Sequence, residues 1–225
     1  MADFTPSSTS EAARDVMVDG QLRPTNVTNQ LVLDAMRALP REVFLPEALR
    51  NLAYIDDCLK LTPGRAMMTP LTLARLIQLA SPLPGETALV VGAGAGYGAA
   101  VLAACGVQVT ALEQDETLLG LSRQAAAHVV SNPPVTWVTG KLADGVPGRA
   151  PYDLILIEGA VRAIPDRIAR QVAQNGRLVT VLWPLRGVGV AVIAEPSTDG
   201  LCERRAFDAA APLLPELLPA AAFAF

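Results

Sequence analysis

Four glycines stand at every second position in the stretch LVVGAGAGYGA, residues 89–99, directly after an apolar run. Each glycine costs about 1 kcal/mol relative to alanine inside a helix, so this stretch does not read as one continuous helix. A strand that leads into a glycine-rich turn and then a helix brings bare backbone close to a ligand, at the edge of a parallel sheet where nucleotides bind. The spacing predicts a site for a ligand that carries a nucleoside.

Glu113 is placed to complete such a site. It ends the alternating run VQVTALE, about twenty residues beyond Gly92, where a carboxylate can accept hydrogen bonds from ribose hydroxyls. Read from Gly92, the turn is G-x-G-x-G; read from Gly94, it is G-x-G-x-x-A, a variant of the dinucleotide fingerprint. The turn alone leaves both cofactor classes open. A third interpretation is that the glycines only permit close packing, with Glu113 as a solvated acid.

The elements that must position these residues alternate between strand and helix patterns. Strands are expected in the run before Gly92 and at 107–112, 135–139, 153–157 and 177–182; helices are expected after the glycines to Cys105, at 115–130, and from Pro165 to Asn175-Gly176. This order predicts a doubly wound, mostly parallel α/β sheet of the Rossmann-like kind. The uncharged stretch from Thr87 to Leu112 would fit a membrane span by hydropathy, but its glycines and its alternating end argue against one.

The two ends of the chain differ from this pattern. Residues 1–15 are expected to form a flexible leader and 16–80 a helical cap, with a helix capped by Thr28 and another whose N-cap is Thr69. The sheet should occupy 81–208 and close with an antiparallel hairpin made by GVAVIAEP and GLCERRAF. The apolar tail at 209–225 contains three prolines and Glu216, so we expect it to pack on the domain or on a second subunit.

Composition narrows the function classes. The chain has 225 residues, 51% hydrophobic content and a net charge of −4, with scattered basic residues, so neither a nucleic acid nor an anionic membrane is an expected partner. Three widely separated cysteines and a single histidine predict no disulfide frame and no metal site, and they favour a cytoplasmic protein.

Longer motifs point to one family. The stretches MVDGQLRP, VLDAMRALPREVFLPEALRNLAY, VVGAGAGYGAAVLA, PYDLILIEGA and NGRLVTVLWP resemble the protein-L-isoaspartate O-methyltransferase family, from Met17 to about Pro215. The resemblance implies S-adenosylmethionine as the cofactor and a carboxylate of isoaspartyl peptides or proteins as the methyl acceptor. The helical start and the antiparallel end of the sheet favour the same class over a dehydrogenase.

The resemblance implies a cofactor site at the matching positions of this sequence. It implies that Gly92, Ala93, Gly94 and Gly96 line the methionine and ribose side, and that Glu113 holds the ribose hydroxyls. Other positions depart from the family pattern. Where the family has G-Q-T-I-S-Q-P this chain has GRAMMTP, so Met68 replaces the active-site serine.

Further departures concern the adenine and the acceptor. The acid expected at the adenine is replaced by Lys141, followed by Leu142, and Asp144 is a candidate substitute. Glu158 stands where the family has a T-A-A-A turn, in reach of both cofactor and acceptor; there it would repel an anionic acceptor, act as a base, or be a solvated loop acid.

The acceptor side has four further candidates besides Glu158. Thr69 can supply the missing hydroxyl or serve only as a helix cap, and Met68 can pack beside the cofactor. Arg65 and Lys141 can attract a peptide carboxylate or be ordinary solvated cations.

The leading hypothesis is a methyltransferase of this family with a divergent acceptor site. A carboxylate acceptor is already ionised at neutral pH, so its methylation requires no general base. The rival hypothesis is a methyltransferase fold that has become a binding or scaffold protein, with the tail as its docking element.

Overall fold

The computed structural model describes residues 8–129, 133–198 and 200–218. Its strands are β1 (Leu59–Thr62), β2 (Arg65–Met67), β3 (Thr87–Val91), β4 (Gln108–Glu113), β5 (Thr136–Thr139), β6 (Tyr152–Val161), β7 (Val172–Leu182), β8 (Val190–Ser197) and β9 (Gly200–Asp208). Its helices are α1 (Ser8–Val16), α2 (Gln30–Ala38), α3 (Pro70–Ala80), α4 (Tyr97–Ala104), α5 (Glu116–Ala126) and α6 (Asp166–Ala169). Shorter helical turns are η1 (Met17–Leu22), η2 (Arg23–Thr25), η3 (Arg41–Phe44), η4 (Glu47–Leu52), η5 (Leu142–Asp144), η6 (Pro147–Arg149) and η7 (Pro215–Leu217).

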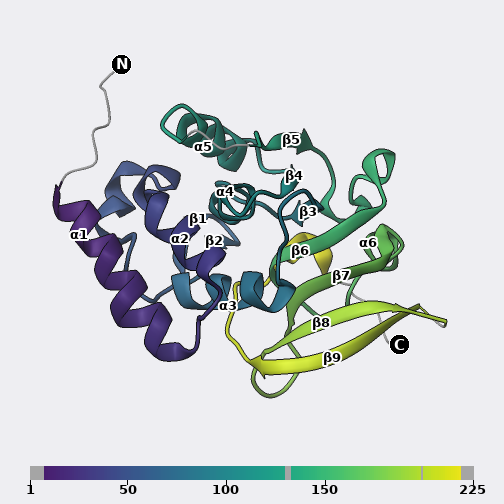
Figure 1. Ribbon diagram of the computed structural model, residues 1–225. Coiled ribbons are helices and arrows are strands. Elements are labelled where there is room, and N and C mark those ends of the chain that lie inside the picture. The colour runs from purple at the N-terminus through teal and green to yellow at the C-terminus, as the bar shows by residue number, and fades with distance from the viewer. Residues whose placement is uncertain (1–7, 130–132, 199, 219–225) are drawn as a thin grey trace.

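The main sheet has the order β5-β4-β3-β6-β7-β8-β9; β8 pairs antiparallel with both β7 and β9, and the other neighbouring strands pair parallel (Figure 1). The expected α/β sheet with a closing hairpin is therefore confirmed. The strand order reverses at β3, whose last residue, Val91, pairs with Leu112 on one side and Ile157 on the other. The loops that follow β3, β4 and β6 thus meet at one edge, which is where such sheets bind ligands.

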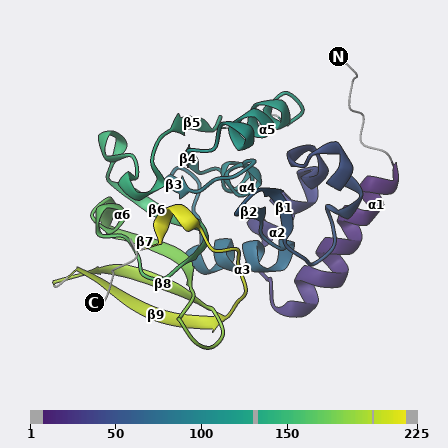
Figure 2. The ribbon, with the colours of Figure 1, turned by 180° about the vertical axis from the view of Figure 1, so that it is seen from behind.

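The N-terminal helices lie beside the sheet and share its core. In Figures 1 and 2, α1 and α2 lie at one end of the sheet, away from the β8-β9 hairpin, whereas α3 packs on β6, β7 and β8. One continuous apolar cluster includes Met17 and Met36 from this region and Val90 and Leu156 from the sheet. A shared core of this kind makes the helical region and the sheet one packed unit.

Two N-terminal expectations need correction. The leader predicted for residues 1–15 is too long, because Ser8–Val16 is helical; residues 1–7 lie outside the described ones. Asn29, not Thr28, caps α2, since its side chain accepts a hydrogen bond from the amide of Val32. The cap of α3 is confirmed: the Thr69 hydroxyl accepts from the amide of Thr72 at 3.0 Å.

The helix predicted from Pro165 to Asn175-Gly176 is wrong. Only Asp166–Ala169 is helical, and the chain joins β7 at Val172. The side chain of Gln171 explains the early end, because it accepts a hydrogen bond from the amide of Val146 at 2.8 Å and donates to the carbonyl of Asp144 at 2.9 Å. These tertiary contacts override the local helical pattern.

The chain beyond β9 turns back across the sheet edge. The amide of Ala160 donates to the carbonyl of Pro212 at 2.7 Å, and the amide of Leu214 donates to the carbonyl of Ala160 at 3.0 Å. The tail therefore packs on its own domain as far as residue 218, as one of the two expectations had it; residues 219–225 lie outside the described part. Among the helices that the structure describes, none has the length and apolar content needed to cross a membrane.

Candidate functional site

The glycine-rich loop between β3 and α4 makes the sharp turn predicted for it. Gly92, Gly94 and Gly96 have φ values of +72°, +59° and +97°, a left-handed region that suits glycine. Their amides are used within the fold: Gly92 and Ala93 donate to the carbonyl of Leu112, and Gly96 donates to the carbonyl of Ala93. The loop residues predicted to hold the cofactor are thus brought together beside β4.

Glu113 lies at the end of β4, directly below this loop. Its side chain is fully buried, so the interpretation as a solvated acid is wrong. The carboxylate accepts hydrogen bonds from the amide of Gly94 at 2.8 Å and from the amides of Gln114 and Asp115 at 2.8 and 3.0 Å. The predicted ribose acid is therefore held rigidly in place.

Arg65, from β2, reaches the same carboxylate. Its two terminal nitrogens lie 2.8 and 2.7 Å from Oε1 and Oε2 of Glu113, and one of them also donates to the carbonyl of Gly92 at 3.2 Å. Arg65 is only 6% exposed, so it is not a solvated loop cation. Burial opposes its charge, but the hydrogen bond and the charge of Glu113 outweigh it and raise the pKa of Arg65.

Side chains lie directly against three of the four glycines. An ideal Cβ at Gly92 would come 3.0 Å from Cδ1 of Leu214, and one at Gly98 would come 2.4 Å from Oε2 of Glu158. A Cβ at Gly96 would meet the ring of Trp137 at 2.4 Å. The close-packing interpretation of the glycines therefore holds for this conformation, at Gly92 as well as at the two later positions.

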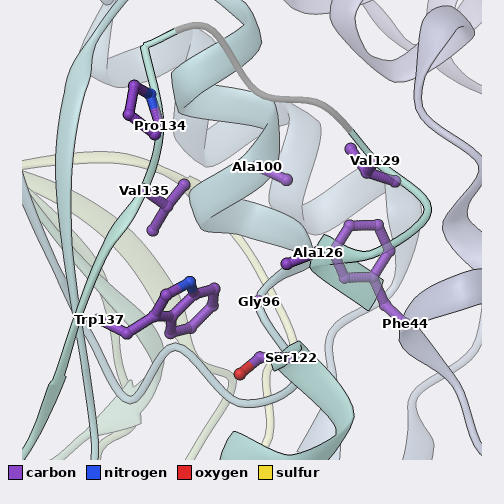
Figure 3. Close-up of a pocket in the computed structure, with 9 residues that line it drawn as sticks. All are labelled: Phe44, Gly96, Ala100, Ser122, Ala126, Val129, Pro134, Val135 and Trp137. Carbon is purple, nitrogen blue, oxygen red and sulfur yellow. The ribbon is translucent and has the colours of Figure 1, made fainter. Parts of the chain in front are cut away.

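The outer side of the loop borders an apolar cavity of about 370 Å³ (Figure 3). Trp137 and Phe44 line opposite parts of it, and Gly96 lies between them. Among the described residues that line it, Ser122 has the only side-chain hydroxyl, which donates to the carbonyl of Leu119 at 2.8 Å. The described part of the lining thus presents no charged group for a nucleotide, and it lies on the side of Gly96 that Trp137 covers.

The three residues predicted to contact the adenine do not form one cluster. Lys141 is exposed, and Asp144 forms an ion pair with Arg167 at the surface. Leu142 is buried, and its amide donates to the Gln114 side chain at 3.2 Å. Leu142 is thus buried beside Gln114, whereas Lys141 and the Asp144–Arg167 pair lie at the surface; the adenine role of all three stays a prediction.

Glu158 projects from a bulge in β6 toward α4. The register with β7 shifts between Leu156 and Ala160, which re-aims the side chain between them. The residue keeps some exposure, but its Oε2 is buried and has no hydrogen-bond partner within the described part of the chain. Burial raises the pKa of Glu158 to about 8, against the opposing charges of Arg41 and Arg65. The expectation of a solvated loop acid is therefore wrong, and the group is mainly neutral at pH 7.

Arg41 and Tyr97 form the rest of this buried polar group, and the sequence did not single them out. Arg41 is fully buried; it donates to the carbonyls of Ala53 and Met68 and lies 4.8 Å from the centroid of the Tyr97 ring. Among the described residues, its Nη1 and the hydroxyl of Tyr97 find no hydrogen-bond partner. The charged pair Arg41 and Glu42 between the apolar residues of LPREVFL was the available signal.

The acceptor-side candidates contribute little from their side chains. Met68 is buried in the main core, and the Thr69 hydroxyl is occupied as the cap of α3. No described residues form a cluster of three or more side chains suited to hold a metal ion.

A glycine-rich turn after β3, an acid at the end of β4 and a sheet that ends antiparallel define the class of S-adenosylmethionine-dependent methyltransferases. Residues 13–199 match the family described as protein-L-isoaspartate (D-aspartate) O-methyltransferase, and the chain belongs to that family.

Relatives agree with this assignment, and solved structures share the fold. A protein-L-isoaspartate O-methyltransferase of Methylorubrum extorquens is 40% identical over 175 residues, covering 78% of this chain and 76% of the relative. Protein-L-isoaspartate O-methyltransferase 1 of Rhodopseudomonas palustris is 39% identical, with 78% and 72% covered. A solved structure of a protein-L-isoaspartate O-methyltransferase has a TM-score of 0.77 at 20% identity, with coverage of 91% of this chain and 67% of that one. A Plasmodium falciparum structure described as a protein-L-isoaspartate O-methyltransferase in complex with S-adenosyl-L-homocysteine has a TM-score of 0.73 at 18% identity. The match covers 90% of this chain and 98% of that one.

S-adenosylmethionine is the cofactor of this class, and the chain keeps the loop and the acid that would receive it. In the present conformation the cofactor does not fit. The space bounded by Gly92, Gly96 and Glu158 is a cavity of about 10 Å³, room for no more than a single water molecule. Small-molecule sites measure hundreds of Å³, so the site as described is closed.

Proposed function

We propose that this protein methylates the carboxylate of isoaspartyl residues in damaged proteins, with S-adenosylmethionine as the methyl donor. The observation that carries the proposal is the family match over residues 13–199, together with the intact glycine loop and Glu113. The same match does not favour the scaffold or the dehydrogenase alternative. Three free cysteines support a cytoplasmic location.

The charge state of Glu158 is compatible with an anionic acceptor. A neutral carboxyl at pH 7 does not repel a carboxylate, and it has a proton to donate in a hydrogen bond. Buried Arg41 adds positive charge beside it. We propose that Glu158 and Arg41 favour the acceptor electrostatically, while the missing hydroxyl at Met68 lowers the rate.

The test is methyl transfer from radiolabelled S-adenosylmethionine to a synthetic isoaspartyl peptide. The matched control is the same peptide with a normal aspartyl linkage, which has the same composition and charge. We expect label in the isoaspartyl peptide alone. A protein that binds S-adenosylhomocysteine but labels neither peptide would contradict this acceptor.

A further inference from the structure

Arg65 donates hydrogen bonds to the acceptor sites of Glu113 that a ribose would need. The Glu113 carboxylate accepts two bonds from Arg65 and three from backbone amides, which exceeds the roughly four acceptor sites of a carboxylate. No lone pair remains for a ribose hydroxyl. Arg65 therefore stands in the ribose position as a competitor of the cofactor.

The segment 209–218 occupies the neighbouring part of the site. Leu214 is 2% exposed, and its side chain would lie 3.0 Å from a Cβ at Gly92 and 2.5 Å from one at Gly159. Two backbone hydrogen bonds to Ala160 hold the segment along the end of β6. Both ribbon views show this yellow C-terminal part lying against β6 (Figures 1 and 2).

Glu216 links Arg65 to the segment 209–218. Its carboxylate lies 3.3 Å from Nη1 of Arg65, so the segment and the arginine support one another across 151 positions of sequence. Farther on, Leu217 packs in one apolar cluster with Leu142, on the adenine side. The segment thus runs from the glycine loop to the predicted adenine side, along the path that a cofactor would take.

We propose that Arg65 and residues 209–218 form a closing segment that occupies the S-adenosylmethionine site, so that cofactor binding requires their displacement. This inference rests on the proposed function for the identity of the cofactor. Its consequence is a reduced apparent affinity, because a ligand that binds only the open state is weakened by the fraction of molecules that are open. Residues that hold the segment closed then control how readily the enzyme binds S-adenosylmethionine.

The test is calorimetric titration of the full chain with S-adenosylhomocysteine. Arg65→Gln removes the charge and restores the residue at this position of the family pattern, and Leu214→Ala removes the side chain that covers Gly92. We expect each variant to bind more tightly than the wild type, and the double variant at least tenfold more tightly. Arg204→Gln and Leu83→Ala, at exposed positions outside the segment, are the matched controls and should leave the affinity unchanged.

Glu216→Gln provides a milder variant, because Glu216 is partly exposed and its loss leaves the Arg65–Glu113 pair intact. It should tighten binding by a smaller factor even where a core variant fails to fold. Equal micromolar affinity of the wild type and all variants would overturn the closing segment, while peptide labelling would still decide the proposed function. Absence of binding in every folded variant would overturn the closing segment and the cofactor site together.

Discussion

Among single residues, Glu158 predicts the clearest pH dependence of stability. Its carboxyl has a buried, unpartnered Oε2 beside α4, and burial raises the pKa of Glu158 to about 8 from its ordinary value of 4.5. The folded state therefore holds a proton that the unfolded state releases between these two values. Stability from this group is full below pH 4.5 and is lost as the pH rises through 8.

Glu158→Gln should remove this dependence. The neutral amide resembles the protonated carboxyl, so we expect similar unfolding free energies at pH 5 and a variant more stable than the wild type at pH 8.5, on the order of a few kcal/mol. Urea unfolding at both pH values measures the difference, with Glu203→Gln on exposed β9 as the control. A gap between variant and wild type that did not grow with pH would mean that Glu158 is ionised in the fold.

Gly96 tests the packing role of a single residue in the loop. Alanine there would place a Cβ 2.4 Å from the Trp137 ring at a φ of +97°, so the ring must shift and the backbone is strained. We expect Gly96→Ala to lower the unfolding free energy by about 1–3 kcal/mol. Gly120→Ala, in α5 with no atom near the new Cβ, should instead be neutral or stabilising, as measured by urea unfolding.

At the scale of elements, α3 depends on its cap. Thr69 satisfies the amide of Thr72 before Pro70 begins the helix. Thr69→Ala should lower the unfolding free energy by about 1 kcal/mol, whereas Thr69→Ser keeps a hydroxyl acceptor and should lose much less. Thermal unfolding of the two variants checks the order; equal losses would show that the methyl group, not the cap, stabilises the helix.

The sequence predicted the elements whose signals are local. The cap Thr69 identified α3, the alternation of strand and helix patterns identified α4 and α5, and the short strand-like runs identified the hairpin. The helix expected after Pro165 failed because the bonds of Gln171 are tertiary.

The candidate site was predicted only where the ends of neighbouring strands build it. The glycines and Glu113 are close in the fold because β3 and β4 are adjacent, which the βα pattern implies. The burial of Arg65 depends on Glu216, 151 residues away, and no local pattern reports such a contact. Glu158 likewise owes its burial to a bulge in β6 and to a helix that packs on it.

At the scale of the whole molecule, Arg177 joins the helical region to the sheet. From β7 its guanidinium donates to the carbonyls of Ala80 and Ser81 at the end of α3, and it forms a two-point ion pair with Glu86 at 2.7 and 2.8 Å. It also reaches the carbonyl of Asp153 on β6. Because Arg177 is largely buried, these charge-assisted bonds are shielded from water and salt.

Arg177→Lys keeps the charge but loses the fork that makes several of these bonds at once. We expect the unfolding free energy to fall by about 1–3 kcal/mol, while Arg204→Lys on exposed β9 changes it by less than about 0.5 kcal/mol. Because the helical region and the sheet share one core, we expect them to unfold together. Tryptophan fluorescence, from Trp137 and Trp183, and far-ultraviolet circular dichroism should therefore report the same urea midpoint, and both midpoints should shift together in the variant. Separate midpoints in Arg177→Lys would show that residues 16–80 fold as a unit of their own, which the guanidinium only tethers to the sheet.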